Sequence, residues 1–415
     1  ILIVFWRKEV IMALLVAVAS SEFLLALNGE GNTLFFTFIN TIERVIEVAS
    51  SPGNSRILIF SILIGALLAY IRESGGVAAT VNLLMNKGVA KSKRQVGYLT
   101  MFSGIAVFIE SNLSVLTSGI LSRGLFDKFK MSRARLAYII DSTSAPVCIL
   151  ILLNGWGAYV LGLLGNYEME ESAVSVLWGS IGYNFYAIIT LLIVFYTITF
   201  DKVHGPLKQA EENLEQQETE LTEEVKGSKA RYMLVPLITL IGSMVGFMFW
   251  TGDGDIASGS GSKSVLYATI LACVVAYFLM ISSRDFTHHK LVDIGFKGMG
   301  ELLPLVAIVL LSLTLGASLK DLGTGVFVAG LVGDFLPIYL VVPVLFLTGA
   351  VISFTTGTSW GTFAILIPIG VPLIQALGLP PSLVIAAILG GGVFGDHCSP
   401  ISDTSAVSAI ASGCD

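Results

Sequence analysis

The sequence has 415 residues, of which 54% are hydrophobic and 13% are Asp, Glu, Lys or Arg, and its mean hydropathy is +0.82. Soluble domains carry about 25% charged residues, so this composition excludes a soluble globular protein. The net charge of −6 is less informative, because the orientation of a membrane protein follows the distribution of Lys and Arg. Apolar runs of roughly 17–25 residues recur along the chain, which predicts an all-α polytopic membrane protein with about ten to twelve membrane elements.

The first part of the chain alternates apolar spans with amphipathic segments. We predict spans over residues 10–27 and 56–71, and interfacial amphipathic segments over residues 33–48 and 75–90. The second amphipathic segment ends in a basic cluster formed by Lys87, Lys91, Lys93 and Arg94. Lys and Arg accumulate in cytoplasmic loops, so this cluster marks the cytoplasmic side.

Residues 97–122 are apolar except near their middle, where the sequence reads Phe108-Ile109-Glu110-Ser111-Asn112. A second basic cluster begins at Arg123, so both ends of the segment lie on the cytoplasmic side. Irregular backbone at membrane depth is tolerated only where it is buried in protein or lines a cavity. We therefore predict a re-entrant helical hairpin with Glu110 and Asn112 at its tip; the alternative is an ordinary span that carries one charge.

Residues 136–164 are predicted to form a broken span, because an acid, hydroxyls and a proline coincide in the run Asp141-Ser142-Thr143-Ser144-Ala145-Pro146. Residues 174–200 then return to the cytoplasm. The charged segment 201–230 is predicted to be a cytoplasmic linker, which acts either as a solvated connector or as a regulatory element.

The second half of the chain shows a similar succession. We predict spans over residues 231–250, 264–281 and 301–318, and a basic interfacial segment over residues 282–300. The apolar segment 338–377 is interrupted by a run rich in hydroxyl side chains that includes Thr356, Thr358 and Ser359. Small residues would explain close helix packing there, but so many hydroxyls at the interruption indicate a polar role.

The last stretch, residues 390–415, places Asp396, His397 and Asp403 in a segment that otherwise has the composition of a membrane span. Ionisable groups at membrane depth are costly and indicate a functional site. The glycines before Asp396 and Pro400 after it break helical hydrogen bonding, which frees backbone carbonyls and hydroxyls to coordinate an ion. Transporters build ion sites from broken helices of this kind.

The two halves of the chain match element by element. Hairpin 97–122 corresponds to segment 338–377, and broken helix 136–164 corresponds to 382–412. Basic clusters flank the first hairpin, whereas no Lys or Arg follows Lys320, so the two hairpins enter from opposite sides. We therefore predict two inverted-topology repeats, each with a re-entrant hairpin and a broken transmembrane helix.

This repeat divides the chain into an N-terminal membrane region at residues 1–200, the linker at 201–230 and a C-terminal membrane region at 231–415. The pairing leaves segment 174–200 without a counterpart. We therefore expect one more helix beyond Asp415.

Three runs carry a resemblance to a known family: LAYIIDSTSAPVC, FTTGTSWGTF and GDHCSPISDTS. They resemble the signatures of the NhaC family of sodium/proton antiporters, within a superfamily whose members have inverted repeats and re-entrant hairpins. The resemblance implies a multi-pass protein of the bacterial cytoplasmic (inner) membrane that uses Na⁺ as transported or coupling ion, and it implies homodimerisation. Many relatives have an acidic pair and a tyrosine at the first hairpin tip, where this chain has Ile109, Glu110 and Ser111.

Sodium is a hard cation that prefers oxygen ligands, and we predict its site where the hairpin tips and broken helices meet near the membrane midplane. The metal ligands are predicted to be the carboxylates of Asp141, Asp396 and Asp403. The remaining candidates for binding Na⁺ or H⁺ are Ser142, Thr143, Ser144, Ser399, Ser402, Thr404 and His397 on the broken helices, and Glu110, Asn112, Thr356, Thr358 and Ser359 on the hairpin tips.

Antiport requires the ion and the proton to compete for one group. Burial and a neighbouring acid both disfavour the charged form of a carboxylate, so protonation and Na⁺ binding become mutually exclusive there. Asp396 and Asp403 are the first choices for this exchange, followed by Asp141, which alternatively makes a structural hydrogen bond at the helix break. Glu110 either contributes to coupling or caps amides at the hairpin tip. His397 either titrates or makes a structural hydrogen bond.

The function predicted on these grounds is secondary exchange of Na⁺ for H⁺. The alternatives are a Na⁺-coupled carrier of a small organic acid or amino acid, a channel, and a membrane subunit that does not transport. An enzyme is not expected, because the sequence has no nucleophile–base signature. The expected partners are Na⁺, H⁺ and the lipid bilayer, with no nucleic acid and no cofactor.

Overall fold

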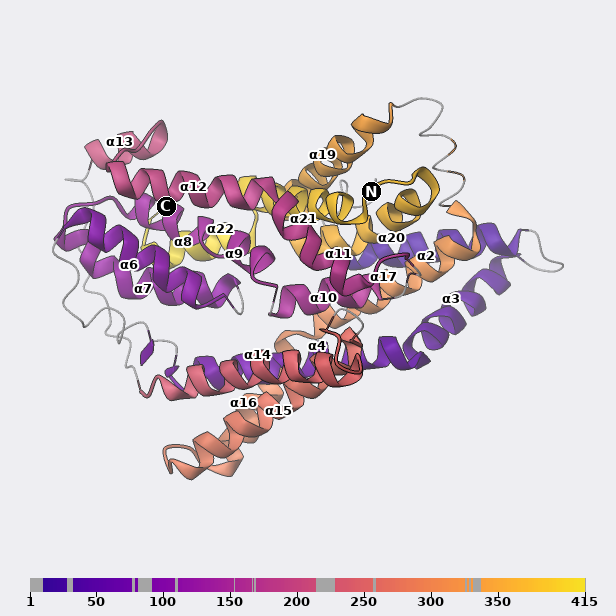
Figure 1. The fold of residues 1–415 in the computed structure, drawn as a ribbon, viewed down its shortest axis with the longest axis horizontal. Helices are drawn as coiled ribbons and strands as arrows, with labels where there is room; N and C mark the ends of the chain where they lie inside the picture. The colour runs from indigo at the N-terminus through magenta and orange to yellow at the C-terminus, as the bar shows by residue number, and fades with distance from the viewer. Residues whose placement is uncertain are drawn as a thin grey trace.

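The computed structural model describes residues 10–27, 33–76, 79–80, 92–108, 111–152, 154–165, 167, 169–213, 228–256, 259–324, 327, 330 and 337–414. These residues form helices and no β-strand (Figure 1). Seven of the described helices are long and apolar enough to cross a bilayer, and two bent helix pairs raise that number to nine. The chain is therefore an all-helical, multi-pass membrane protein. Much of the predicted amphipathic segment 75–90 lies outside the described residues.

One layer of the molecule lies along the lower part of Figure 1. It is formed by α4 (Pro52–Glu73), α14 (Arg231–Thr251), α15 (Gly261–Ser282) and α16 (His288–Glu301), which pack on one another. Gly65 of α4 and Gly298 of α16 allow close approach, because a Cβ on either glycine would collide with the carbonyl oxygen of the other. The first and second halves of the chain are thus joined in this layer.

A second group of helices is built around the first predicted hairpin. It contains α6 (Lys93–Ala106), α7 (Ser111–Lys128), α8 (Arg133–Ser142), α9 (Ala145–Leu150) and, from the end of the chain, α22 (Asp403–Ser412). The hydroxyl of Ser114 on α7 donates to the carbonyl oxygen of Gly104 on α6 at 2.9 Å, which ties the two arms of the hairpin near its tip. Gly119 of α7 lies against Ala411 of α22.

The second predicted hairpin consists of α19 (Ile338–Thr356) and α20 (Ser359–Leu377), and α21 (Pro381–Cys398) packs on both. Next to them lie α10 (Gly155–Leu164), α17 (Leu303–Asp321) and the N-terminal helices α2 (Val10–Ala26) and α3 (Thr33–Ser50). In Figure 1 the α6–α7 pair lies at the left of the molecule and the α19–α20 pair lies at its right, with α21 and α22 between them.

The predicted span 174–200 is divided in the structure. It forms α11 (Ala173–Ser180), a 3₁₀ turn at Ile181–Tyr183 and α12 (Phe185–Phe200), with a bend of 42°. The bend falls at Gly179, Ser180, Gly182 and Asn184, which are helix-weakening residues that the sequence analysis did not use. In the linker, a short helix α13 (Pro206–Glu212) is held at the start of α8 by an ion pair between Glu211 and Arg135 at 3.4 Å.

Candidate functional site

Asp396 lies near the C-terminal end of α21, and only 2% of the residue is exposed. Its Oδ2 atom accepts a hydrogen bond from the hydroxyl of Ser359 at 3.0 Å. Ser359 is the first residue of α20, directly after the break in the second hairpin. The structure therefore joins the acid of one predicted motif to the hydroxyl of another, across 37 positions in the chain.

The glycines that precede Asp396 bring it to this position. A Cβ on Gly391 would collide with the carbonyl oxygen of Phe346, and a Cβ on Gly395 with that of Ala350. Both carbonyls belong to α19, so the glycines let α21 lie directly against the backbone of α19. This close packing carries the end of α21 to the tip of the hairpin formed by α19 and α20.

The hairpin tip itself requires a glycine. Gly357 ends α19 with φ = 67°, a left-handed conformation that residues with a side chain rarely adopt. A Cβ there would also press on the carbonyl oxygen of Ile401, in the break between α21 and α22. The two interrupted segments of the second half are therefore in direct contact.

Asp141 occupies the corresponding position in the first half. It is the penultimate residue of α8, which stops before Thr143, and Pro146 lies in the first turn of α9. Its Oδ1 atom accepts a hydrogen bond from the hydroxyl of Ser408 on α22 at 3.2 Å. A carboxylate at the break of one half thus contacts a hydroxyl from the broken helix of the other half.

Tyr186 of α12 contacts the C-terminal end of α21. Its hydroxyl and Nδ1 of His397 form a hydrogen bond of 2.8 Å, and its ring packs edge-on against Phe394. His397 is therefore held by a tyrosine of α12. The sequence analysis did not single out Tyr186, because it lies in an apolar run with no motif.

The hydroxyls of the breaks donate mainly to backbone carbonyls. Thr143 donates to Ile139, Ser144 to Asp141, Thr356 to Ile352 and Ser399 to Phe354, at 2.7–2.9 Å, while Ser402 and Thr404 bond to each other. Ser142 is buried. A hydroxyl that donates its hydrogen to a carbonyl keeps oxygen lone pairs, which are what a cation requires.

Two predicted site residues fall outside this description. Glu110 and the side chain of Asp403 are not among the described residues, although the backbone of Asp403 begins α22. Asn112 and Thr358, from the two hairpin tips, both line a cavity of about 390 Å³. Residues from both hairpin tips thus line the same cavity.

The walls of this cavity are largely aromatic and aliphatic. Trp360 stacks on Tyr159 with ring centroids 4.8 Å apart and lies 5.2 Å from the ring of Trp156. The cavity also reaches Arg72 at the end of α4 and Glu301 at the end of α16, which form an ion pair with both distances at 2.9 Å. The sequence analysis quoted the run FTTGTSWGTF, which contains Trp360, but named none of its aromatic partners.

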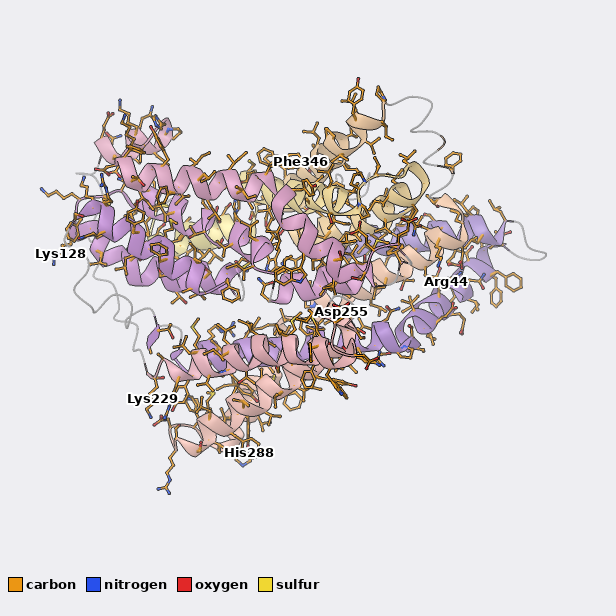
Figure 2. All side chains as sticks on the ribbon, in the orientation of Figure 1. Arg44, Lys128, Lys229, Asp255, His288 and Phe346 are labelled. Carbon is orange, nitrogen blue, oxygen red and sulfur yellow. The ribbon has the colours of Figure 1, made fainter. Side chains whose placement is uncertain are left out.

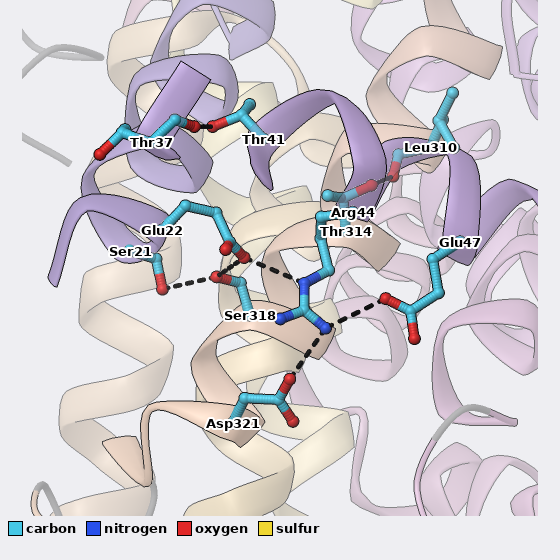
Figure 3. Close-up of polar contacts among 10 residues, drawn as sticks. All are labelled: Ser21, Glu22, Thr37, Thr41, Arg44, Glu47, Leu310, Thr314, Ser318 and Asp321. Atoms are coloured by element: carbon cyan, nitrogen blue, oxygen red, sulfur yellow. Dashed lines mark hydrogen bonds and ion pairs between the residues drawn. The ribbon is translucent and has the colours of Figure 1, made fainter. Parts of the chain in front are cut away.

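A second charged cluster lies away from the helix breaks (Figure 3). Glu22 of α2 is 2% exposed and accepts hydrogen bonds from Arg44 at 3.0 Å and from Ser318 at 2.8 Å. Arg44 also pairs with Asp321 at 2.8 Å and with Glu47 at 3.3 Å. Burial alone would lower the pKa of Arg44, but the hydrogen bond to Glu22 and the three negative charges raise it overall.

The sequence analysis did not predict this cluster. Its members come from α2, α3 and α17, which are far apart in the chain. An acid near the end of an apolar helix, such as Glu22, is the one signal in the sequence that pointed to it.

Comparison with known proteins agrees with this architecture. The family model described as the Na⁺/H⁺ antiporter family matches residues 147–415. An uncharacterized protein of Haemophilus influenzae is 29% identical over 441 residues, covering 97% of this chain and 84% of that protein. An uncharacterized Na⁺/H⁺ antiporter of the same organism is 43% identical over 82 residues, covering 19% of this chain and 17% of that protein. The malate-2H⁺/Na⁺-lactate antiporter of Bacillus subtilis is 41% identical over 69 residues, covering 16% and 14%.

Two solved structures share the fold. The YdaH transporter of Alcanivorax borkumensis has a TM-score of 0.62 at 14% identity, covering 99% of this chain and 90% of its own. MtrF of Neisseria gonorrhoeae, described as illuminating a class of antimetabolite efflux pumps, has a TM-score of 0.60 at 12% identity, covering 97% and 88%. At these identities the likeness concerns the fold.

Proposed function

Because the chain belongs to the Na⁺/H⁺ antiporter family, we propose that this secondary transporter exchanges Na⁺ for H⁺ across the cytoplasmic membrane by alternating access. The observation that carries the proposal is Asp396, a buried carboxylate at the end of α21 that accepts a hydrogen bond from Ser359 at the second hairpin tip. A buried ionisable group at a helix break is a recurring feature of ion pathways in membranes.

The chemistry follows from the ligand types. Asp396 supplies a carboxylate, and the neighbouring breaks supply hydroxyl and carbonyl oxygens, which suit a hard cation such as Na⁺. A negative charge at this depth is stabilised either by Na⁺ or by a proton, and one displaces the other. Asp141, with Ser408 as its partner, is the second acid of the exchange.

We further propose that the two halves are inverted repeats that move relative to each other. In both halves a helical hairpin precedes a broken helix, as α6–α7 precede α8–α9 and α19–α20 precede α21–α22. The two hairpins lie toward opposite ends of the molecule in Figure 1. Such an arrangement presents one central site alternately to the two sides of the membrane.

The test uses the purified chain in liposomes that contain a pH-sensitive dye. Na⁺ is added outside an acid-loaded interior, with no organic solute present. The internal pH is expected to rise with the native chain and to stay constant with Asp396→Asn. The matched control is Asp285→Asn, which removes an exposed acid outside the site and is expected to exchange normally. An unchanged response in Asp396→Asn would contradict the assignment of the site.

A Na⁺-coupled carrier of a small organic acid or amino acid is the second candidate function. The observation that favours it is the cavity of about 390 Å³ at the two hairpin tips, which is far larger than a bare ion requires. The similarity to the malate-2H⁺/Na⁺-lactate antiporter covers 16% of the chain and points in the same direction. If Na⁺ alone leaves the internal pH unchanged and an added carboxylate or amino acid restores the response, this candidate replaces simple exchange.

A further inference from the structure

The cavity at the hairpin tips has the shape of a solute site with two different ends. It follows one face of α4 from Ser61 through Ile64 and Leu68 to Arg72, a rise of about 16 Å at 1.5 Å per residue. At the Arg72 end, the ion pair with Glu301 is partly exposed, at 38% and 41%. Gly75, three residues after Arg72, accepts a hydrogen bond from the N–H group of Ser228, next to Lys229. Lys229 and His288 lie toward one end of this layer in Figure 2, opposite Arg44, so the positive-inside rule assigns the Arg72 end to the cytoplasm.

Three helices also begin at this cavity. Asn112, Gly155 and Thr358, which are at or next to the first residues of α7, α10 and α20, line the space. At α10 the side chain of Asn154 already accepts hydrogen bonds from the N–H groups of Trp156 and Gly157. The N-terminus of a helix carries a partial positive charge and unpaired N–H groups. Three helix N-termini that meet at one cavity favour a negatively charged group there.

An independent observation points to the same chemistry. Trp156 lines the cavity and is 2% exposed, and its buried indole Nε1 makes no hydrogen bond within the part of the chain that the structure describes. An indole N–H is a donor only, and a buried donor without an acceptor is costly. A ligand that brings an acceptor to this end would remove that cost.

The walls between the two ends determine the rest of the ligand. Phe60, Ile64, Leu305 and Ile308 contribute apolar surface, together with the ring of Trp360. Burying a second charged group against such a wall would be unfavourable, whereas an apolar body gains from leaving water. The cavity therefore distinguishes a monocarboxylate with an apolar body from a dicarboxylate.

We propose that this cavity binds a small organic monocarboxylate with an apolar body, whose carboxylate accepts a hydrogen bond from the indole N–H of Trp156. The apolar body extends along α4 toward Arg72. This inference deepens the second candidate function and rests on it. Binding is measured without an ion gradient, so its failure is separate from a failure of Na⁺/H⁺ exchange.

The test is calorimetric titration of the purified full-length chain, in NaCl, with four probes that differ in one group each. Phenyllactate has the carboxylate and the apolar ring, and phenylalanine replaces its hydroxyl by an ammonium group. Malate replaces the ring by a second carboxylate, and 3-phenylpropane-1,2-diol replaces the carboxylate by an alcohol. Phenyllactate or phenylalanine is expected to bind at least about tenfold more tightly than malate and the diol, because a hydrogen bond to a charged group is lost with the diol.

Binding of either aromatic acid supports the proposal. The acid that binds more tightly shows whether the carboxylate belongs to a hydroxy acid or to an amino acid. Equal affinity for the diol and for the acids would overturn it, and so would the absence of binding by both acids at millimolar concentration. Tighter binding of malate would overturn the assignment of an apolar body.

Variants separate recognition from folding. Trp156→Phe keeps an aromatic ring, although a smaller one, and removes the N–H, and it is expected to weaken binding of the acid roughly tenfold while leaving the diol unchanged. If Trp156 had only a structural role, Trp156→Phe would weaken binding of the acid and of the diol equally. Trp178→Phe, on the exposed face of α11, is the matched control and should bind normally. If Arg72→Gln abolishes binding and Trp156→Phe has no effect, the proposed orientation is wrong.

A second variant tests the location by filling the cavity. Leu305→Trp adds volume at the wall and is expected to abolish binding of every probe. Ile238→Trp places the same side chain on the exposed surface of α14 and serves as the control. Native affinity in a folded Leu305→Trp variant, as judged by its melting curve, would show that the ligand binds elsewhere.

Discussion

Glu22 and Asp396 are both 2% exposed, yet their surroundings differ in kind. Glu22 faces the guanidinium group of Arg44 and the hydroxyl of Ser318, so a fixed positive charge offsets its own. Asp396 receives the hydroxyl of Ser359, a neutral partner, at a helix break. The guanidinium group gives Glu22 a charge partner within the protein, whereas Ser359 orients Asp396 without a charge of its own.

The backbone around the two acids differs in the same sense. Glu22 and Arg44 project from the uninterrupted helices α2 and α3, which hold the pair in one geometry. Asp396 lies where α21 ends, next to the left-handed Gly357 and the start of α20. Interrupted helices expose carbonyl oxygens that continuous helices keep bonded. We therefore expect two acids of equal burial to have different roles, one in holding α2, α3 and α17 together and one in binding ions.

The largest expected effect is that of Asp396→Asn. Ligand binding raises stability with the logarithm of the ratio of ligand concentration to dissociation constant, by about 2.7 kcal/mol at a hundredfold excess. The native chain should therefore melt at a higher temperature in NaCl than in choline chloride, and the Asn variant should show no such difference. Its melting temperature in choline should stay close to native, because Asn keeps the shape of the side chain. If Na⁺ still raises the melting temperature of Asp396→Asn, the proposed difference in role between Asp396 and Glu22 is wrong.

Glu22→Gln should have the opposite profile. Removing one member of a buried ion pair leaves the partner charge uncompensated, which costs about 3 kcal/mol of unfolding free energy. The cost is smaller here because Glu47 and Asp321 still pair with Arg44. We expect a lower melting temperature and an undiminished Na⁺ effect. The double variant with Glu22→Leu and Arg44→Met should recover at least half of the loss, because it leaves neither charge unpaired. Loss of the Na⁺ effect in Glu22→Gln would show that the cluster takes part in ion binding.

Ser359→Ala tests the hydroxyl that orients Asp396 and should have a smaller effect. One hydrogen bond to a charged group contributes about 1.5 kcal/mol, which corresponds to roughly tenfold weaker Na⁺ binding. The measurement is a titration of the melting temperature with NaCl. Ser312→Ala is the matched control, because Ser312 is also buried and donates to a neutral carbonyl, that of Ala364, at 2.6 Å. Equal shifts in the two variants would mean that Ser359 acts through packing alone.

The sequence was a good guide to elements that depend on local composition. Composition and apolar length predicted the all-helical membrane fold, and the coincidence of Gly, Pro and acids predicted helix ends at Ser142 and Cys398. The interruption of segment 338–377 was predicted from its hydroxyl-rich run and occurs at Gly357 and Thr358. These features are visible locally because breaking a helix requires particular residues at particular positions.

The contacts that complete the candidate site were not predictable in this way. Tyr186 reaches His397 across 211 positions, and Ser408 reaches Asp141 across 267. Neither residue belongs to an unusual pattern, since a tyrosine in an apolar run and a serine on a helix are common in membrane proteins. Which side chains meet depends on how α8, α12, α21 and α22 cross, and a single sequence contains no direct record of crossing angles.

An exposed acid completes the comparison and should show the smallest effect. Asp285 pairs with Lys229 at 2.7 Å and accepts a hydrogen bond from Tyr232 at 2.6 Å, and these two partners lower its pKa to about 2 from 3.8. A carboxyl group whose folded pKa is depressed stabilises the fold above its unfolded pKa, and that contribution disappears as the pH falls from about 4 to about 2. Asp285→Asn should thus melt slightly below the native chain at pH 7, with an unchanged Na⁺ effect, and the gap should narrow by pH 3 and close near pH 2. A difference in melting temperature that stays constant down to pH 3 would mean that the carboxylate charge does not cause it. Asp285 would then no longer serve as the exposed ion pair in the comparison with Glu22 and Asp396.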